Sequence, residues 1–188
     1  MKKIIFDVDD TLWGLNKKIC KKLHISYDII TTYSAYDNYK LTKKEQVSMI
    51  KEYGNPEMFQ NISWFQDVEK LNELNADIYI NSNSLNQECT NQKLKELLKI
   101  LQIPKENIII NVLDTKEKIK EKRIAKDTYI FVDDSPYNIL TSDAVYNFML
   151  KQPWNQTEEA QKLISHKNVE FFDNFSEIIH RIQELIKE

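Results

Sequence analysis

Glycine is scarce in this sequence: only Gly14 and Gly54 occur among 188 residues. A phosphate-binding P-loop and a dinucleotide-binding fingerprint both need several glycines, because the backbone must approach the phosphate closely. Neither motif can be built from this chain. If the protein handles phosphate, we expect it to use side chains and a few loop amides.

Cysteine and long apolar runs are also scarce. Cys20 and Cys89 are not spaced as metal ligands and have no histidine cluster nearby, which argues against a zinc site and favours reduced thiols. No apolar run approaches the roughly 20 residues that a membrane-spanning helix needs. The N-terminal stretch reaches Asp7 before the apolar segment of a signal peptide could form. We therefore expect a cytoplasmic protein with no membrane partner.

The charge balance gives no sign of a strongly basic surface. The formal net charge is −3 at pH 7, and lysine and glutamate are interleaved along the helical stretches. Binding to nucleic acid would require a basic face, so we expect no nucleic-acid partner. We interpret the lysine runs at 17–22 and 116–126 as solvated helix faces.

Short apolar runs rich in β-branched and aromatic residues predict β-strands. Most are continuous rather than alternating, which is typical of parallel strands covered on both faces. Helical stretches separate them at 63–75, 86–102, 116–126 and 174–187. The pattern predicts an α/β fold, a Rossmann-like parallel sheet sandwiched by helices. The predicted strands are 2–7, 77–82, 107–112, 128–133, 145–150 and 169–172.

The segment 14–62 contains no convincing strand. It reads as helices: LNKKICKKL, then the aromatic segment YSAYDNYK, then TKKEQVSMIKEYG. We interpret it as a small helical cap inserted after the first strand, over the carboxyl edge of the sheet. The expected domains are an α/β core formed by 1–13 and 63–188, and a cap at 14–62.

Polar residues follow several predicted strands at their carboxyl ends. The first strand leads into Asp7, Asp9 and Asp10, another ends in NSNS at 81–84, and a third ends in VDDSP at 132–136. These ends share one edge of a parallel sheet, where ligands bind in open α/β folds. Several carboxylates at one edge would repel one another without a cation. Oxygen-only ligands suit Mg²⁺.

These motifs resemble those of a known family. DVDDTL at 7–12 resembles the first motif of haloacid-dehalogenase-like (HAD) phosphohydrolases, and FVDDSPYNI at 131–139 resembles their acidic fourth motif. Ser82 lies where that superfamily carries a Ser or Thr after its second strand. The DDSPYNI pattern, together with QPWN at 152–155, resembles the 5′(3′)-deoxyribonucleotidase branch.

The resemblance implies a catalytic pair in the first motif. Asp7 would attack phosphorus as the nucleophile and form an aspartyl-phosphate. Asp9 would protonate the leaving alkoxide and then act as general base on the hydrolytic water. Asp10 is expected to face away and stabilise the turn, and Thr11 could serve either the turn or the site.

The resemblance also implies Mg²⁺ as cofactor. Asp7, the backbone carbonyl of Asp9 and one member of the Asp133–Asp134 pair would bind it. Adjacent strand residues face opposite ways, so only one of the pair should ligate directly, and we favour Asp134. An alternative is that Asp133 and Ser135 merely cap the following helix. We expect this capping for Ser135, but it does not account for the first motif.

Ser82, Asn83 and a lysine would hold the phosphoryl oxygens and offset the charge that develops during transfer. We favour Lys118, because a lysine near the start of a helix at 116–126 could reach back to the strand ends. Lys116 and Lys122 stay open as alternatives.

Aromatic side chains of the cap are candidates for substrate recognition, because aromatic rings stack on nucleobases. Trp13 is the favoured substrate-binding residue, since it directly follows the catalytic loop. For each single aromatic residue, packing is the more common role. The other candidates are Tyr33, Tyr36, Tyr39, Phe59, Trp64 and Phe65.

The sequence thus predicts a Mg²⁺-dependent phosphomonoester hydrolase for a small-molecule phosphate ester, with nucleoside monophosphates as the favoured substrates. One alternative is a HAD phosphatase for another small phosphorylated metabolite. Two others involve no turnover: a phospho-accepting receiver-like module and a partner-binding module. The order of the motifs and the segment inserted after the first strand argue against a receiver. The oligomeric state stays open.

Overall fold

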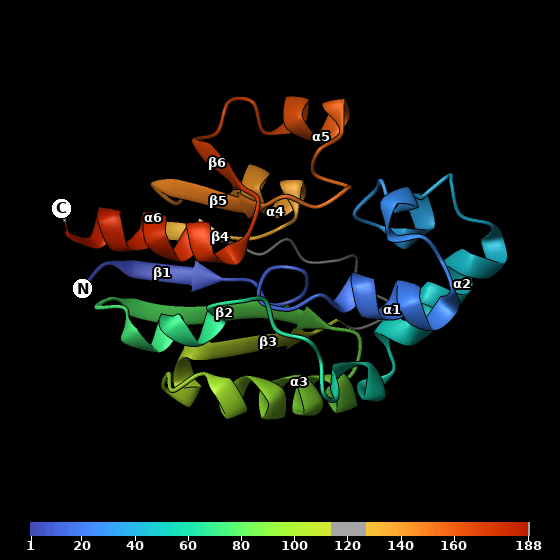
Figure 1. The fold of residues 1–188 in the computed structure, drawn as a ribbon, viewed down its shortest axis with the longest axis horizontal. Helices are drawn as coiled ribbons and strands as arrows, with labels where there is room; N and C mark the ends of the chain where they lie inside the picture. The colour runs from blue at the N-terminus through green and yellow to red at the C-terminus, as the bar shows by residue number, and fades with distance from the viewer. Residues whose placement is uncertain (114–126, 188) are drawn as a thin grey trace.

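The computed structural model describes residues 1–113 and 127–187. Within them the strands form one parallel six-stranded sheet in the order β3-β2-β1-β4-β5-β6, which Figure 1 shows. Each strand lies within or close to a predicted apolar run, so the predicted α/β fold with a parallel sheet is confirmed. The strands are β1 (Lys3–Phe6), β2 (Asp77–Ser84), β3 (Ile108–Val112), β4 (Thr128–Val132), β5 (Tyr146–Leu150) and β6 (Val169–Phe172).

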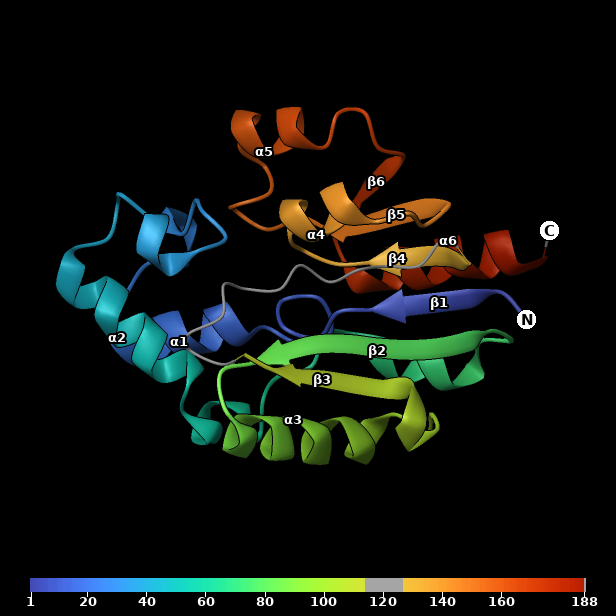
Figure 2. The same cartoon turned by 180° about the vertical axis from the view of Figure 1, so that it is seen from behind.

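Helices cover both faces of the sheet. Side chains of α3 (Gln87–Ile100) and α6 (Phe175–Lys187) share one apolar cluster with Ile4 and Phe6 of β1. Ile5 points to the other face and belongs to a second cluster with residues of α4 (Pro136–Thr141) and α5 (Glu158–Leu163). Figures 1 and 2 show these two layers from opposite sides. Burial on both faces explains why the strand sequences are continuously apolar.

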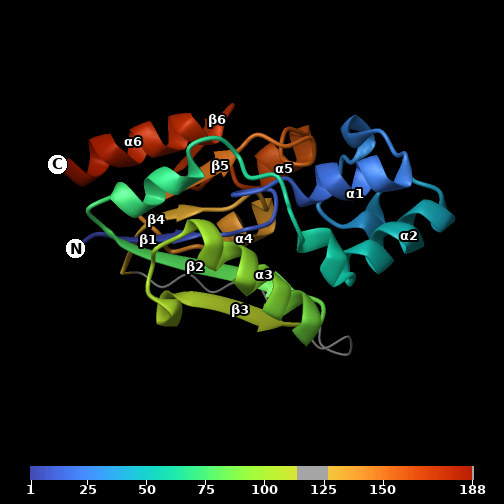
Figure 3. The ribbon, with the colours of Figure 1, turned by 60° about the horizontal axis from the view of Figure 1, so that its bottom comes forward.

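The segment 14–62, which follows β1, is helical, as its sequence predicts. Its two α-helices are α1 (Leu15–Leu23) and α2 (Lys43–Tyr53), and three short 3₁₀ turns accompany them. The turns are η1 (Tyr27–Ile29), η2 (Ala35–Asp37) and η3 (Pro56–Phe59). In Figures 1 and 3 the segment lies beyond the carboxyl ends of the strands. Its separation from the core as a cap subdomain stays a prediction.

Three helical predictions have different outcomes. The 63–75 stretch forms only a 3₁₀ helix, η4 (Val68–Glu73), which begins after Asp67 at a left-handed φ of 68°. The C-terminal helix begins as expected: the side chain of Asn174 accepts a hydrogen bond of 3.0 Å from the Glu177 amide. The 116–126 prediction lies outside the described residues. In the described part of the chain, no helix has both the length and the apolar character needed to cross a membrane.

Candidate active site

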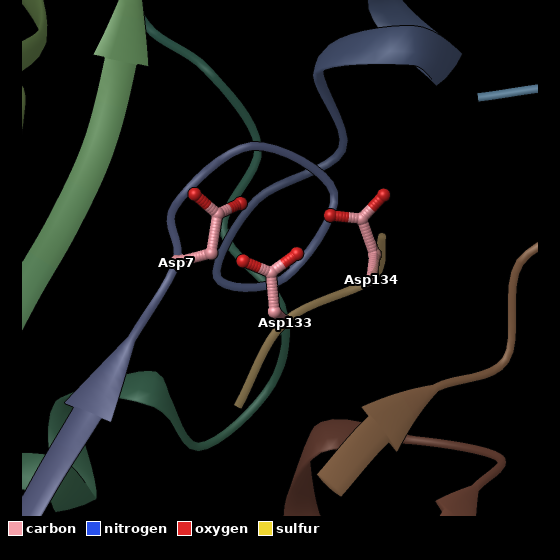
Figure 4. Close-up of side chains that lie close together, drawn as sticks. All are labelled: Asp7, Asp133 and Asp134. Carbon is pink, nitrogen blue, oxygen red and sulfur yellow. The ribbon is translucent and has the colours of Figure 1, made fainter. Parts of the chain in front are cut away.

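Three buried carboxylates meet at the carboxyl edge of the sheet. Asp7 follows β1, and Asp133 and Asp134 follow the neighbouring β4; their exposed fractions are 5%, 0% and 2%. Each residue offers a carboxylate oxygen, and these oxygens lie within 4.8 Å of one another, as Figure 4 shows. The two loops are in contact, because the Asp7 amide donates to the Val132 carbonyl at 2.8 Å.

Both members of the Asp133–Asp134 pair reach this cluster. The expectation that they face opposite ways assumed that the strand continues through them, but β4 ends at Val132. Beyond a strand end, the alternation of side chains no longer applies. The structure therefore brings both side chains to the predicted metal site.

The donor set of the cluster fits a hard divalent cation. Buried carboxylates close together raise each other's energy unless a positive charge offsets the repulsion. Carboxylate oxygens are the ligands that Mg²⁺ prefers in proteins, and three of them leave room in its octahedral shell for water or a phosphate oxygen. The three residues could therefore hold Mg²⁺.

Asp133 is fixed by the start of α4. The Ser135 amide donates to its Oδ1 at 2.8 Å, and the Asn138 side-chain amide donates to Oδ1 at 3.1 Å and to Oδ2 at 2.9 Å. Ser135 is the N-cap of α4, with Pro136 at the first turn. The expected capping role of Ser135 is confirmed, and it coexists with the participation of Asp133 in the acidic cluster.

Asp134 is held by residues from two other loops. The indole N–H of Trp154 donates to its Oδ2 at 2.9 Å, and the side-chain amide of Asn155 donates to its backbone carbonyl at 3.1 Å. The Thr11 hydroxyl lies 3.5 Å from Asp134 Oδ1. Thr11 thus contacts the acidic cluster through its hydroxyl, while its amide donates to the Val8 carbonyl within the turn at 3.3 Å.

A lysine that sequence reasoning missed lies at the centre of the site. Lys93 of α3 is fully buried, and its Nζ donates to Asp9 Oδ2 at 2.6 Å, to the Asn83 carbonyl at 2.7 Å and to Ser82 Oγ at 3.2 Å. Lys93 thus joins the proposed acid/base to the two proposed phosphate-binding residues. The favoured Lys118, with Lys116 and Lys122, lies outside the described residues.

One signal in the sequence could have pointed to Lys93. It lies four residues from both Cys89 and Leu97, so it shares the buried face of α3 with them. A lysine is seldom fully buried unless it is paired. Lys93 lies on the buried face of α3, the helix that follows NSNS. Its position there therefore indicates an anionic partner at the strand ends.

Trp13 does not have the position expected of a substrate-stacking residue. It is fully buried, and its ring packs edge-on against Trp64 with centroids 4.9 Å apart. Its indole N–H donates to Asp9 Oδ1 at 2.7 Å. The turn after Asp9 folds the ring inward, so in this structure Trp13 orients Asp9 and presents no free face to a ligand.

Asp10 stabilises the turn, in line with its expected role. Its φ of 58° is left-handed, and its carboxylate accepts hydrogen bonds from the Asn16 amide at 3.0 Å and the Asn16 side chain at 2.7 Å. Burial, reinforced by the charge of Asp9, raises the pKa of the Asp10 carboxyl well above its ordinary value. These contacts connect the catalytic loop to α1.

A cavity of about 210 Å³ opens between the strand ends and the helical segment. Its polar wall includes Asp7, Asp9, Ser82 and Lys93. The cavity also has aromatic and aliphatic lining residues. They include Leu15, Tyr33, Ile50, Tyr53, Phe59 and Leu85. A small molecule with a strongly polar group and an apolar part would match this mixed lining.

Asn83 lines the cavity as well, but its side chain has another neighbour. Its Oδ1 accepts a hydrogen bond of 3.3 Å from Asn111 of the adjacent strand β3, while its backbone carbonyl accepts from Lys93. Successive residues of a strand face opposite sides, so Ser82 turns toward Lys93 and Asn83 turns away. Asn83 therefore reaches Lys93 through its main chain.

No protein-family model matches the sequence, and no curated protein matches it. Several solved structures are similar to the chain over nearly its whole length. A protein described as a candidate phosphatase from Clostridium difficile is 12% identical, with a TM-score of 0.57 and coverage of 96% of this chain and 98% of that one.

Two further solved structures are similar to the chain in fold. A predicted phosphoglycolate phosphatase from Haemophilus somnus is 16% identical, with a TM-score of 0.56 and coverage of 97% and 98%. A candidate HAD-hydrolase from Bacillus subtilis, YfnB, crystallised with magnesium, is 15% identical, with a TM-score of 0.51 and coverage of 96% and 98%. At these identities the likeness concerns the fold alone: the chain has the α/β fold of the HAD-superfamily hydrolases.

Proposed function

We propose that this protein is a Mg²⁺-dependent phosphomonoester hydrolase that acts on small phosphorylated molecules. The observation that supports it most is the meeting of Asp7 with Asp133 and Asp134 at one sheet edge, beside Asp9. A nucleophile, an acid/base and a cation site are the parts that phosphoryl transfer through a covalent intermediate requires. The shared fold with HAD hydrolases agrees with this function.

In the proposed reaction, a carboxylate oxygen of Asp7 attacks phosphorus, and the bond from phosphorus to the ester oxygen breaks. Asp9 gives its proton to the departing oxygen and then takes a proton from the water that hydrolyses the aspartyl-phosphate. Bound Mg²⁺ would offset the charge of the phosphoryl oxygens near Asp7, Asp133 and Asp134. The products are the alcohol and inorganic phosphate.

Lys93 and Ser82 would bind the phosphoryl oxygens. Both side chains line the cavity beside Asp7, and Lys93 already contacts Ser82 and Asp9. A fixed cation and a hydroxyl placed where negative charge develops stabilise the transition state without reorganisation. Trp13 would keep the Asp9 carboxylate directed at the ester oxygen through its indole N–H.

The proposed substrates are nucleoside monophosphates. The QPWN and DDSPYNI motifs resemble the deoxyribonucleotidase branch, and the aromatic rings of Tyr33, Tyr53 and Phe59 in the cavity wall suit a flat base. Aliphatic side chains such as Leu15, Ile50 and Leu85 also line the cavity, and they suit a leaving group with an apolar face.

The test is hydrolysis of a generic aryl phosphate and of a panel of nucleotides and sugar phosphates, with Mg²⁺ and with EDTA. We expect turnover that depends on Mg²⁺, is lost in Asp7→Asn, and is fastest on nucleoside monophosphates. Metal-independent turnover, or full activity of Asp7→Asn, would contradict the mechanism. A clear preference for sugar phosphates would keep the mechanism and remove the nucleotidase assignment.

A further inference from the structure

The QPWN motif forms a buried turn between β5 and α5 that contacts both acidic loops. Gln152, Trp154 and Asn155 are 4%, 2% and 0% exposed. The side chain of Asn155 closes the turn: its Oδ1 accepts from the Gln152 amide at 3.0 Å, and its Nδ2 donates to the Leu150 carbonyl at 3.0 Å. The turn is therefore fixed by its own hydrogen bonds and can hold other groups in place.

The turn contacts Asp134 through three hydrogen bonds. Trp154 Nε1 donates to the carboxylate Oδ2 at 2.9 Å and, with the longer distance of 3.3 Å, to the Asp134 carbonyl. Asn155 Nδ2 donates to the same carbonyl at 3.1 Å. Trp154 thus contacts both the side chain and the main chain, and Asn155 contacts the main chain. Figure 4 shows one carboxylate oxygen of Asp134 directed toward Asp7 and Asp133, and the other directed away.

The turn also reaches the first acidic loop and the helical segment. Gln152 Nε2 donates to the Asp10 carbonyl at 2.7 Å, and Gln152 Oε1 accepts from the Tyr27 hydroxyl at 2.5 Å. The Tyr27 ring packs edge-on against Trp154, with centroids 6.0 Å apart. A single turn thus ties together the loop after β1, the loop after β4 and η1.

We propose that Trp154 is a positioning residue that sets the affinity of the acidic cluster for Mg²⁺ by orienting Asp134, an inference that rests on the proposed magnesium-dependent function. Residues that hydrogen-bond to a metal ligand fix its orientation and tune metal affinity. An indole N–H suits this role because it is a single neutral donor. It restrains the carboxylate without cancelling the charge that attracts the cation.

Burial makes this contact effective. In a water-free environment a hydrogen bond is electrostatically stronger, and an acceptor that loses its donor has no water to replace it. Without the indole N–H, the Asp134 carboxylate loses the donor to its Oδ2 and is held less firmly in the orientation of the cluster. Binding of the cation would then have to restore more of that orientation.

The experiment compares Mg²⁺ binding by the full-length wild-type protein, Trp154→Phe and a matched control, Trp64→Phe. Trp64 lies outside the turn and contacts Trp13 through its ring. Binding of Mg²⁺ alone is measured by calorimetry, and the Mg²⁺ concentration for half-maximal turnover is measured separately. We expect Trp154→Phe to weaken Mg²⁺ binding about tenfold, with kcat at saturating Mg²⁺ largely retained. Trp64→Phe should change the Mg²⁺ affinity less than twofold.

A measurement on the wild-type protein tests the proposal even if Trp154→Phe does not fold. The protein has three tryptophans, so ¹⁵N-labelled wild-type protein gives three indole N–H resonances. Trp13→Phe and Trp64→Phe proteins identify the resonance of Trp154 by elimination. We expect this resonance to shift as Mg²⁺ is added, and its indole proton to exchange slowly with solvent.

The outcomes separate the two proposals. If the wild type binds Mg²⁺ but Trp154→Phe binds it equally well, or the Trp154 resonance does not move, the positioning role is wrong and the proposed function stands. If the wild type binds no Mg²⁺ and turns over without metal, the proposed function fails and this inference fails with it.

Discussion

The carboxylates of the two acidic loops differ in one of their described donors. After β1, Asp9 pairs with the buried ammonium of Lys93 at 2.6 Å and also accepts from the indole of Trp13 at 2.7 Å. After β4, Asp133 accepts from the amides of Asn138 and Ser135, and Asp134 accepts from the indole of Trp154. The Lys93 contact brings a full positive charge to its carboxylate, whereas these amide and indole donors are neutral.

This difference agrees with the proposed division of labour. A carboxylate that binds Mg²⁺ must keep its charge and have a fixed orientation, which neutral donors provide. Asp9 must exchange a proton and lie beside the phosphoryl group, where a cation also serves the substrate. Four substitutions test this comparison, and they follow from the largest expected effect to the smallest.

Replacement of Lys93 should have the largest effect. Lys93→Met removes the cation shared by Asp9, Ser82 and the Asn83 carbonyl, and we expect kcat/KM for an aryl phosphate to fall by roughly 10²- to 10³-fold. Steady-state kinetics at saturating Mg²⁺ measure it, with circular dichroism as the check on folding. The matched control is Lys99→Met, because Lys99 lies on the outer part of α3 with a side chain 48% exposed. Equal activity of Lys93→Met and wild type would show that Lys93 has no part in catalysis.

Replacement of Asn138 tests the loop after β4. Asn138→Ala removes the amide that bonds to both oxygens of Asp133, and we expect the Mg²⁺ concentration for half-maximal turnover to rise about tenfold. Asn72→Ala is the control, because Asn72 bonds instead to the Ile100 carbonyl and the Gln102 amide. A lower kcat with unchanged Mg²⁺ dependence would mean that Asn138 does not act through the metal site.

Replacement of Trp13 distinguishes orientation of Asp9 from stacking on a substrate. Trp13→Phe keeps an aromatic ring but loses the N–H that donates to Asp9. We expect kcat to fall by several-fold to about tenfold, with KM nearly unchanged. The measurement is steady-state kinetics on a nucleoside monophosphate and on phenyl phosphate. A rise in KM confined to the nucleotide would restore the stacking role.

The smallest effect is expected far from both loops. Asn174 accepts from the Glu177 amide at the start of α6, and loss of an N-cap typically costs about 1 kcal/mol of stability. Asn174→Ala should therefore lower the free energy of unfolding by about 1 kcal/mol in urea denaturation and leave kcat/KM unchanged. If Asn174→Ala left the free energy of unfolding unchanged, the cap assignment would be wrong.

The local sequence pattern was sufficient to predict much of the fold. The continuous apolar runs located the six strands, and the segments LNKKICKKL and TKKEQVSMIKEYG located α1 and α2 almost to the residue. Strand direction then follows from the helical connections, and the carboxyl ends of parallel strands share one edge. That rule was enough to predict that Asp7, Asp133 and Asp134 lie at one edge of the sheet, where the structure brings them together.

The sequence by itself therefore determined the sheet and the acidic cluster, because both depend on the residues of each strand and on where it ends. Only the tertiary structure decided which partner holds each carboxylate. Lys93 is 84 residues from Asp9, and Gln152 is 142 residues from Asp10. Helical spacing places Lys93 on the buried face of α3, but which carboxylate it meets depends on how that face packs against the strand ends. The contact of Gln152 depends in the same way on how its turn packs. The burial of Trp13 was decided in the same way, by a turn that folds the ring against Trp64.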